Sequence, residues 1–543
     1  MAKQASLATT VPPYAERRRQ IENEPLPRNI GALLDDAATA APDYPALEFF
    51  EQGERVTYAA LRDLVNRLAN GLAQAGVRKG SHVGVILPNV LAMPATWLAL
   101  ARLGAVMVPM NIAYTPREMS YVVGNAEVEF LVIDEERLPT LAALPERPRE
   151  LTDDRVFVLG TPREGQRSWD ALRNADSAPV RREPVDRDDL MNIQYTSGTT
   201  GFPKGCMLSH RYWLTIGKVN ARRDGLAYAR ILAATPFFYM DPQWLLLMSF
   251  YQRASLFVAL RQSASRFMDW VRAYRIQFCL FPEIVCKQPV SASDRENEIV
   301  RVNVYGLHKE IHAALQQRFA FVVREAFGMT EVGSGLFMPI EAVDMVGSGS
   351  CGIPVPFREA RIAAPDGAPV AKGEIGELLL RGPGMLSGYY RNPDATAAAF
   401  HGDWFRTGDL FRQDERGYYY IVGRIKEMIR RAGENISARE VEAVLREMPD
   451  IVEAAAVPVP DATRGEEVKI FVVLRPGLGR EDVPPQRIIA HCEARLARFK
   501  VPRYVAYLDH LPKTPSEKIA KHLLVIAPHA AAGTYDRVEA CWT

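Results

Sequence analysis

Residues 82–134 read HVGVILPNVLAMPATWLALARLGAVMVPMNIAYTPREMSYVVGNAEVEFLVID, and this stretch decides the fold class. Short apolar runs at 82–87, 105–110 and 130–134 predict buried strands, and residues 91–103 predict a helix between the first two. Strands that alternate with helices predict parallel sheets covered by helices, because parallel neighbours need a long crossover connection. The sequence therefore predicts an α/β fold here.

A second helix start lies at Thr-Pro-Arg-Glu, residues 115–118. Thr115 suits the cap, Pro116 suits the first helical position, and Glu118 three residues after the cap completes a capping box. The α/β pattern is expected to continue, because similar apolar runs recur at 231–236, 255–260, 278–283 and 302–306.

The elements become shorter after residues 417–429, which predicts a separate, small α+β domain. A capping box of Ser437 and Glu440 predicts a helix start. Strands are expected at 451–459, 468–474 and 503–508, with a helix at 486–498.

This change of pattern predicts three parts: an N-terminal extension of residues 1–28, a large domain of 29–424 and a small, mobile domain of 425–543. A hinge is expected at residues 424–426. The first 25 and last 15 residues are expected to be poorly ordered ends.

Residues 195–205, YTSGTTGFPKG, carry the strongest local signal for chemistry. Glycines let the backbone approach an anion closely, and N–H groups with Ser and Thr hydroxyls can surround phosphates. Lys204 adds a positive charge. The spacing differs from that of the P-loop of NTPases. The alternative interpretation is an ordinary polar surface loop.

This string resembles the phosphate loop of the adenylate-forming superfamily, which contains acyl-CoA synthetases, peptide-synthetase adenylation domains and luciferases. Four further segments match in the same order: FGMTE (327–331), WFRTGD (404–409), GRIKEMIRRAGEN (423–435) and LPKTPSEK (511–518). The resemblance covers about residues 30–525 and implies an acyl-CoA synthetase-like fold with a small mobile C-terminal domain. Some features look like the crotonobetaine/carnitine-CoA ligase branch.

The resemblance implies an ATP site. Thr330 would contact the α-phosphate, Glu331 would coordinate Mg²⁺, and Lys518 would bridge the acyl carboxylate and the α-phosphate. Asp409 would bind the ribose hydroxyls, and Arg424 the ribose or phosphates. The β- and γ-phosphates would be held by Thr196, Ser197, Gly198, Thr199, Thr200, Gly201 and Lys204, and adenine would lie against Tyr305, Gly306, Leu307, Phe327 and Gly328.

Two further positions follow from the resemblance: Lys426 would be the hinge residue, and Gly433 would face the pantetheine channel of CoA. The expected substrate pocket comprises Tyr239, Asp241, Trp244, Gly328 and Val332. Tyr239 stands where the family often has His, so it is expected to narrow the pocket. Tyr239, Asp241 and Trp244 could together favour a cationic acid through cation–π attraction. The alternative is that Trp244 belongs to a helix core.

The predicted function is therefore that of an AMP-forming carboxylate–CoA ligase, with a small carboxylic acid, ATP and CoA as substrates and Mg²⁺ as cofactor. One alternative is an adenylating enzyme that loads a carrier-protein thiol. Others are a catalytically silent nucleotide-binding relative and a phosphotransferase that would release ADP. The acid could be aliphatic, aromatic or betaine-like, and a monomer or a homodimer is expected.

The composition excludes other classes. The 543 residues carry 66 basic and 65 acidic side chains, which argues against a nucleic-acid binder. Apolar runs are too short to predict an integral membrane protein. Six scattered cysteines predict reduced thiols and a cytoplasmic location, with Cys206 and Cys351 as bystanders. Residues 347–352 match G-x-G-x-x-G, but the prolines that follow predict a loop rather than a dinucleotide site.

Overall fold

The computed structural model describes residues 11–543 apart from 179–182, 197–202, 432–433, 462, 515–517 and 526–532. The chain divides into two compact units. The first comprises Met1–Thr196, Lys204–Ala360 and Leu380–Phe405, and the second comprises Ser197–Pro203, Arg361–Leu379 and Arg406–Thr543. The boundary at residues 424–425 stays a prediction.

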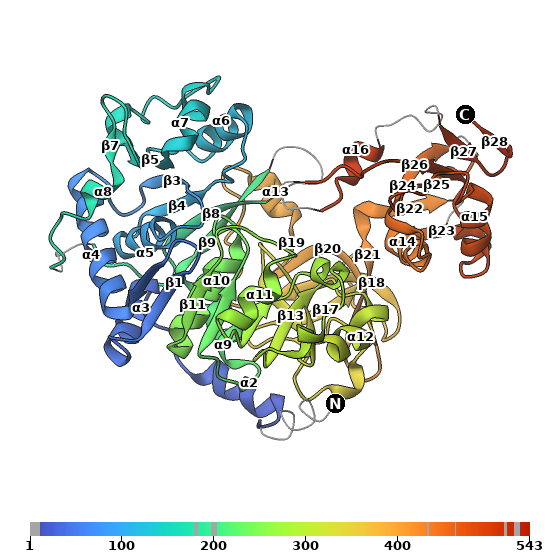
Figure 1. Ribbon diagram of the computed structural model, residues 1–543, viewed down its shortest axis with the longest axis horizontal. Helices are drawn as coiled ribbons and strands as arrows, with labels where there is room; N and C mark the ends of the chain where they lie inside the picture. The colour runs from blue at the N-terminus through green and yellow to red at the C-terminus, as the bar shows by residue number, and fades with distance from the viewer. Residues whose placement is uncertain are drawn as a thin grey trace. The chain divides into compact units, whose positions relative to one another are not determined.

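Residues 82–134 form the centre of a seven-stranded sheet with the order β7-β6-β5-β3-β4-β8-β9. β3 pairs in parallel with both β4 and β5, α5 links β3 to β4, and α6 links β4 to β5 (Figure 1). The prediction of parallel strands covered by helices is confirmed. The bounds are β3 His82–Ile86, α5 Ala92–Leu103, β4 Val106–Pro109, α6 Pro116–Asn125, β5 Phe130–Asp134, β6 Val156–Leu159, β7 Arg167–Ser168, β8 Leu190–Thr196 and β9 Lys204–Ser209.

A nine-stranded sheet has the order β16-β15-β14-β13-β12-β10-β11-β1-β2. The strands from β10 to β14 pair in parallel, and β15 then turns back against β14. The four predicted strand runs all lie in this sheet. The bounds are β1 Pro45–Phe49, β2 Glu54–Thr57, β10 Arg230–Ala233, β11 Ser255–Val258, β12 Phe278–Leu280, β13 Arg301–Tyr305, β14 Val322–Met329, β15 Gly333–Phe337 and β16 Ile353–Pro354.

The other helices of the first unit surround these sheets. Helices α9 and α10 lie side by side, with α10 directly before β11 (Figure 1). The bounds are α2 Tyr14–Asn23, α3 Ile30–Ala40, α4 Tyr58–Gln74, α7 Leu138–Ala142, α8 Trp169–Leu172, α9 His210–Arg222, α10 Met240–Gln252, α11 Phe267–Ala273, α12 Lys309–Phe319 and α13 Pro393–Ala398.

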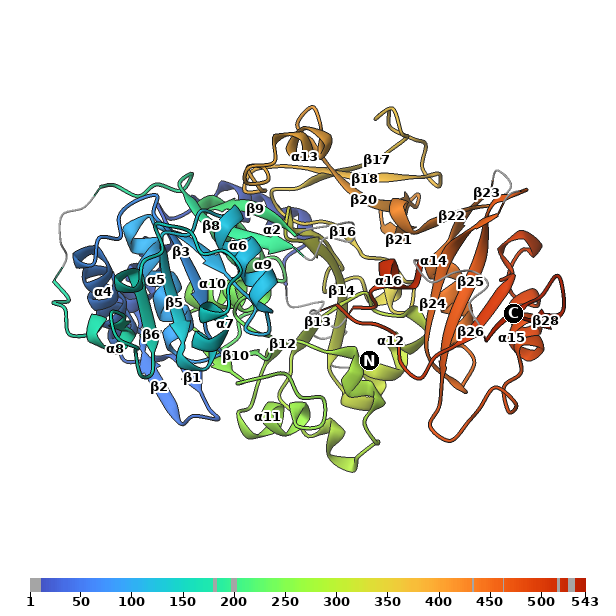
Figure 2. The same ribbon diagram turned by 90° about the horizontal axis from the view of Figure 1, so that it is seen from above.

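The C-terminal part of the second unit is an α+β unit, as the sequence predicts. The long strands β24 and β25 pair antiparallel, and α14 and α15 share one apolar core with β25 through Val441, Ile470 and Ile488 (Figure 2). The bounds are β22 Met428–Arg431, β23 Glu434–Ser437, α14 Ala438–Arg446, β24 Ile451–Asp461, β25 Gly465–Leu474, α15 Pro485–Glu493, β26 Tyr504–Tyr507, α16 Lys521–Val525, β27 Thr534–Asp536 and β28 Cys541–Trp542.

A further sheet has the order β17-β18-β20-β19, with β21 paired to β20. Short 3-10 turns stand between several elements. The strand bounds are β17 Glu359–Ala363, β18 Ile375–Arg381, β19 Phe400–His401, β20 Trp404–Gln413 and β21 Tyr419–Arg424, and the 3-10 bounds are η1 Glu135–Arg137, η2 Asp153–Arg155, η3 Glu283–Lys287, η4 Ala292–Arg295, η5 Val343–Met345, η6 Ile425–Glu427 and η7 Arg498–Lys500.

The two predicted capping boxes have different outcomes. At Thr115 the box is complete, because the hydroxyl accepts from the Glu118 N–H and the Glu118 carboxylate accepts from the Thr115 N–H. At Ser437 the hydroxyl accepts from the Glu440 N–H, but the Glu440 carboxylate binds Lys500 Nζ at 2.7 Å. An ion pair with a distant lysine thus replaces the return bond of the second box.

The prediction of poorly ordered ends is wrong for the described residues. Tyr14 Oη on α2 donates to the Pro354 carbonyl at 2.6 Å, and Arg17 is 3% exposed and binds Glu341 at 3.0 Å. At the other end, β27 pairs with β26. These contacts join residues far apart in the sequence, so local composition gives no sign of them.

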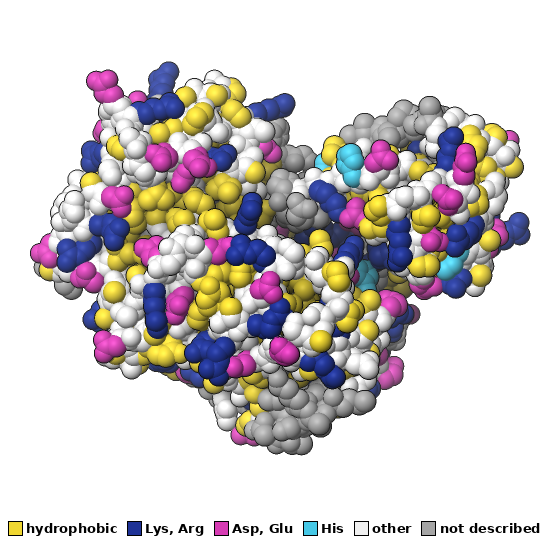
Figure 3. Space-filling model, in the orientation of Figure 1, with side chains coloured by type: hydrophobic (Ala, Val, Ile, Leu, Met, Phe, Trp, Pro, Cys, Tyr) yellow, Lys and Arg dark blue, Asp and Glu magenta, His cyan; other side chains and the backbone are white. Residues whose placement is uncertain are grey.

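The surface of the first unit mixes charges of both signs. On the face shown in Figure 3, Lys and Arg side chains are interspersed with Asp and Glu, in line with the net charge of +1. Among the helices within the described ranges, none has both the length and the apolar character that crossing a bilayer requires.

Two buried histidines make the first unit sensitive to acid. Burial lowers the pKa of His210 to about 4, and burial also lowers the pKa of His312 to about 4. His312 lies between two backbone groups, because Gly347 N–H donates to Nδ1 at 3.1 Å and Nε2 lies 3.1 Å from the Val323 carbonyl. Unfolding exposes both rings, so the unfolded chain binds protons first as pH falls below about 6.5.

We expect stability to be full above about pH 6.5 and to fall as pH drops toward 4, with each histidine costing about 1 kcal/mol at pH 5.5. Thermal unfolding followed across this range measures the slope. His312→Gln, whose amide can still meet both backbone groups, should flatten it, whereas His401→Gln at an exposed position should not. Parallel curves for His312→Gln and the parent chain would contradict this account.

Candidate functional site

The predicted adenine-binding residues meet where two parallel strands end. β13 and β14 pair with Tyr305 opposite Ala326, so Tyr305 and Phe327 reach the same edge of the sheet together. The chain turns sharply at Gly306, where φ is +71°, and Leu307 is buried beneath the turn. Tyr305 is 41% exposed. The edge thus presents aromatic surface suited to a planar ring.

Thr330 and Glu331 lie in the tight turn between β14 and β15. A Cβ at Gly328 would come within 2.5 Å of the Gly333 carbonyl oxygen, and Gly333 has φ of +70°. Both positions therefore need glycine. Val332 is fully buried, which anchors the turn, and Glu331 is 8% exposed.

A tyrosine that the sequence analysis missed links Lys204 to Glu331. The Lys204 Nζ lies 4.2 Å from the centre of the Tyr389 ring, and Tyr389 Oη donates to Glu331 Oε1 at 3.0 Å. Burial and the Glu331 carboxylate raise the pKa of Tyr389, so the phenol keeps its proton and donates. Residues 386–390, LSGYY, contain two adjacent tyrosines, and only the pairing with β9 determines which one faces Lys204.

Three of the five predicted substrate residues, Tyr239, Asp241 and Trp244, lie at the start of α10. Tyr239 directly precedes the helix without capping it, and its Oη receives a hydrogen bond from Asn111 Nδ2 at 3.4 Å, while Thr330 Oγ1 lies 3.9 Å from Met240 Sδ. The Trp244 indole N–H donates to Asp241 Oδ1 at 3.1 Å, and the ring is 1% exposed. Asp241 lies within electrostatic reach of the Tyr305 phenol. Trp244 therefore orients the carboxylate from within the core.

Buried amides hold the backbone in front of α10. Gln194 Nε2 donates to the Phe238 carbonyl at 2.7 Å, and Gln243 Nε2 donates to the Phe237 and Tyr239 carbonyls at 3.0 and 3.1 Å. Asn192 joins the two glutamines and accepts from the Trp97 indole N–H. These partners are fixed, so Tyr239 stands on a rigid support.

Asp409 and Arg424 pair across the antiparallel strands β20 and β21 in the second unit. Arg424 Nε lies 3.0 Å from Asp409 Oδ1. Asp409 is 2% exposed, and burial raises the pKa of its carboxyl although Arg424 opposes that change. The bonds to the ribose stay a prediction. Lys426 follows in the turn η6, and its hinge role also stays a prediction.

Lys518 is bound to Thr514 in the second unit. Thr514 N–H donates to the Lys518 carbonyl at 2.7 Å, and Lys518 N–H donates to Thr514 Oγ1 at 3.2 Å. The side chain of Lys518 is exposed. Ser197, Gly198, Thr199, Thr200, Gly201 and Gly433 lie outside the described residues.

The partly buried Lys521, whose side chain is 18% exposed, fixes the chain directly after Lys518. Its Nζ lies 2.8 Å from Glu427 and 2.7 Å from Glu442. Burial opposes the charged form, yet the two carboxylates raise the pKa of Lys521 overall. The sequence analysis did not single out this lysine. It ties the segment after Lys518 to α14 and to the turn that contains Lys426.

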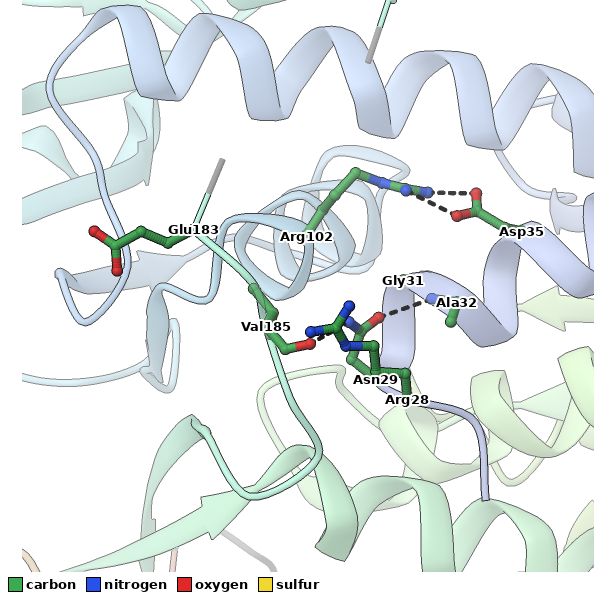
Figure 4. Close-up of a pocket in the computed structure, with 8 residues that line it drawn as sticks. All are labelled: Arg28, Asn29, Gly31, Ala32, Asp35, Arg102, Glu183 and Val185. Carbon is green, nitrogen blue, oxygen red and sulfur yellow. Dashed lines mark hydrogen bonds and ion pairs between the residues drawn. The ribbon is translucent and has the colours of Figure 1, made fainter. Parts of the chain in front are cut away.

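One surface pocket lies where several elements pack together, and it is not a candidate site. Figure 4 shows that Arg102 and Asp35 bind each other there and that Asn29 binds the backbone. Arg102 Nη2 lies 2.7 Å from Asp35 Oδ1, and Asn29 Nδ2 donates to the Val185 carbonyl at 2.7 Å.

Cys206 is an unsuitable nucleophile, because burial raises the pKa of its thiol well above the ordinary value.

The residues present fit a magnesium ion that is bound mainly by phosphates. Within the part of the chain that the structure describes, no three His, Cys, Asp or Glu side chains converge to hold a metal. Glu331 supplies a single carboxylate, one oxygen of which binds Tyr389. Mg²⁺ commonly takes one or two carboxylates and completes its shell with phosphate oxygens and water.

The chain matches known families over most of its length. The AMP-binding enzyme family model matches residues 34–390, and that of the AMP-binding enzyme C-terminal domain matches residues 440–518. A sulfoacetate–CoA ligase from Cupriavidus necator is 32% identical over 501 residues, which covers 91% of this chain and 96% of the relative. A crotonobetaine/carnitine–CoA ligase from Salmonella paratyphi C is 32% identical and covers 91% and 98%.

Solved structures agree with the fold. ATP-bound MatB from Rhodopseudomonas palustris has a TM-score of 0.82 at 28% identity, covering 92% of this chain and 98% of that one. The anthranilate CoA ligase AuaEII, in complex with anthranoyl-AMP, has a TM-score of 0.84 at 24% identity, covering 93% and 98%. The predicted acyl-CoA synthetase-like architecture is confirmed.

We expect Lys521→Met to destabilise the C-terminal part by about 3 kcal/mol, because it leaves two carboxylates facing each other without their cation. Lys513→Met is the matched control. Its ion pair with Glu453 is more exposed, so its loss should cost at most about 0.5 kcal/mol. The stability loss of each variant is measured by unfolding the full chain in urea and following the unfolding through proteolysis of the C-terminal part. Equal losses in the two variants would contradict the importance of the Lys521 cluster.

Proposed function

We propose that this chain, which belongs to the AMP-binding enzyme family, is an ATP-dependent ligase that joins a carboxylic acid to coenzyme A. In the first half-reaction a carboxylate oxygen attacks the α-phosphorus of ATP, and the bond to pyrophosphate breaks. In the second, the sulfur of CoA attacks the acyl carbonyl, AMP leaves, and the thiol proton passes to solvent. AMP and pyrophosphate are the products.

The observation that carries this proposal is the arrangement of Lys204, Tyr389 and Glu331 within the first unit. The Lys204 ammonium and the Glu331 carboxylate both contact the buried phenol of Tyr389. The same unit also contains the sheet edge that presents Tyr305 and Phe327. Such a pair suits a magnesium-bound nucleoside triphosphate, because the ammonium meets phosphate oxygens and the carboxylate meets the metal. Bound Mg²⁺ would neutralise phosphate charge.

The other residues take supporting roles in this proposal. Phe327 and Tyr305 hold adenine by stacking, and Thr330 donates to the α-phosphate. Asp409 accepts from the ribose hydroxyls, and Arg424 orients Asp409. Lys518 offsets the repulsion between the acyl carboxylate and the α-phosphate, and rotation of the small domain about Lys426 would withdraw it before thiolation. Gly433 would face the pantetheine arm.

The proposal also covers the class of acid, the cellular compartment and the oligomeric state. We favour an acid that carries a cationic group, because Asp241 supplies a negative charge beside Tyr239. A relative is named as a crotonobetaine/carnitine–CoA ligase, although another is named for sulfoacetate, which is anionic. The six free cysteines fit a reducing compartment such as the cytoplasm. A monomer or homodimer is expected.

The activity can be measured first as ATP–pyrophosphate exchange with Mg²⁺ and without CoA, across betaine, sulfonated, aliphatic and aromatic acids. Exchange that depends on one acid class is the expected result. Addition of CoA should then yield a thioester and AMP. Release of ADP in place of AMP, or transfer only to a carrier-protein thiol, would contradict the proposal.

Lys518→Ala should reduce acyl-adenylate formation about 10²–10³-fold, because the neutralising ammonium is lost where two anions meet. Transfer from a supplied acyl-adenylate to CoA should keep the rate of the parent chain. Single-turnover assays of the two half-reactions separate these effects. If both steps slow equally, Lys518 does not act in the first step alone.

Asp241→Asn tests the charge of the acid, since Asn can still accept from Trp244 Nε1. We expect KM for a betaine acid to rise about tenfold while KM for its neutral isostere stays unchanged. Initial rates of pyrophosphate exchange provide both constants. A lowered KM for an anionic acid, with no change for the betaine, would assign the pocket to the opposite charge.

A further inference from the structure

The segment of residues 386–390 is bound along the edge of β9, directly after the phosphate loop. Met207 N–H donates to the Gly388 carbonyl at 2.9 Å, and Ser387 N–H donates back to the Met207 carbonyl at 2.9 Å. Tyr390 N–H donates to the Gly205 carbonyl at 2.8 Å. The segment is thus an added antiparallel strand that places Tyr389 opposite Cys206.

The same segment also binds the turn between β14 and β15. Leu386 N–H donates to the Glu331 carbonyl at 2.8 Å. β9 belongs to the seven-stranded sheet, and β14 and β15 belong to the nine-stranded sheet. Residues 386–390 therefore fasten together the two sheets that supply Lys204 and Glu331.

Tyr389 is the side chain at the centre of this connection. It is 5% exposed, and its own N–H donates to Thr396 Oγ1 at 2.9 Å, so its position is fixed by the backbone. Its ring faces the Lys204 ammonium at 4.2 Å, and its hydroxyl donates to Glu331 at 3.0 Å. The ammonium and the carboxylate both contact the tyrosine, and these two described side chains form no ion pair with each other.

We infer that Tyr389 is a positioning residue that holds the Lys204 ammonium and the Glu331 carboxylate apart, ready for the phosphates and for Mg²⁺. This inference rests on the proposed function. Without the phenol, the Lys204 ammonium and the Glu331 carboxylate would be free to form an ion pair. That ion pair would have to break before MgATP could bind. By binding one oxygen of Glu331, the hydroxyl would orient the carboxylate so that its second oxygen could bind Mg²⁺.

The two contacts of Tyr389 can be separated by substitution. Tyr389→Phe removes the hydroxyl that binds Glu331 and keeps the ring that faces Lys204. Tyr390→Phe is the matched control, because the neighbouring hydroxyl donates to Glu127 at 2.6 Å, on a residue with no role in the proposed reaction. Affinities for MgATP and for AMP, measured by calorimetry, are the primary readouts, with thermal unfolding of each variant.

Tyr389→Phe should weaken MgATP binding about tenfold, because the released Glu331 carboxylate is then free to pair with Lys204. AMP binding should change by no more than about twofold, because AMP has no β- or γ-phosphate for Lys204 to hold. Pyrophosphate exchange should then need a higher Mg²⁺ concentration, and added Mg²⁺ should restore the rate. A purely structural loss would not respond to the metal. Tyr390→Phe should resemble the parent chain in every measurement.

Three results would overturn the inference. Unchanged MgATP affinity in Tyr389→Phe would contradict the inference about Tyr389 while leaving the proposed function in place. Equal loss of AMP and MgATP binding, without rescue by Mg²⁺, would show that Tyr389 only supports the fold. Failure of the parent chain to bind either nucleotide would reject the proposed function, and this inference with it.

Discussion

The parallel pairing of β13 with β14 is the constraint on which the candidate site depends. It brings Tyr305 and Phe327 to one edge of the sheet, and β14 then turns back at once into β15. That turn is possible only because Gly328 leaves room for the Gly333 carbonyl. A side chain at position 328 would force the two strands apart and would move Glu331 away from Tyr389. The position of the carboxylate therefore depends on a residue that has no chemistry of its own.

Much of the fold follows from local patterns in the sequence. The strands within residues 82–134 are apolar except at single end residues such as His82 and Asp134, because helices cover both faces of the sheet, and this gives a strong signal. The Thr115 cap is complete because both partners lie within three residues. At Ser437 the same pattern is only half formed, because Lys500, which is 60 residues away, binds Glu440. Local signals therefore predict elements well and long-range ion pairs poorly.

The site shows the same division. Motifs identify Lys204, Glu331, Asp409 and Lys518, since each lies in a characteristic string. Tyr389 and Lys521 act through partners far along the chain, so their neighbours in the sequence do not reveal them. The buried amides behind Tyr239 belong to this group too, because Asn192, Gln194 and Gln243 become partners only after β8 and α10 have packed together. The backbone at the start of α10, where the acid pocket is predicted, is therefore fixed by amides from distant parts of the chain.

Helix α2 has a consequence for how the chain assembles. Its anchors are the Arg223 carbonyl, Glu341 and Pro354, the first of which lies 206 residues after Arg17 in the sequence. The buried Arg17 guanidinium cannot be satisfied until those residues have folded, so docking of α2 is a late step with a large loop to close. Before that step this polar helix stays undocked, and the first unit closes around it only when nearly complete.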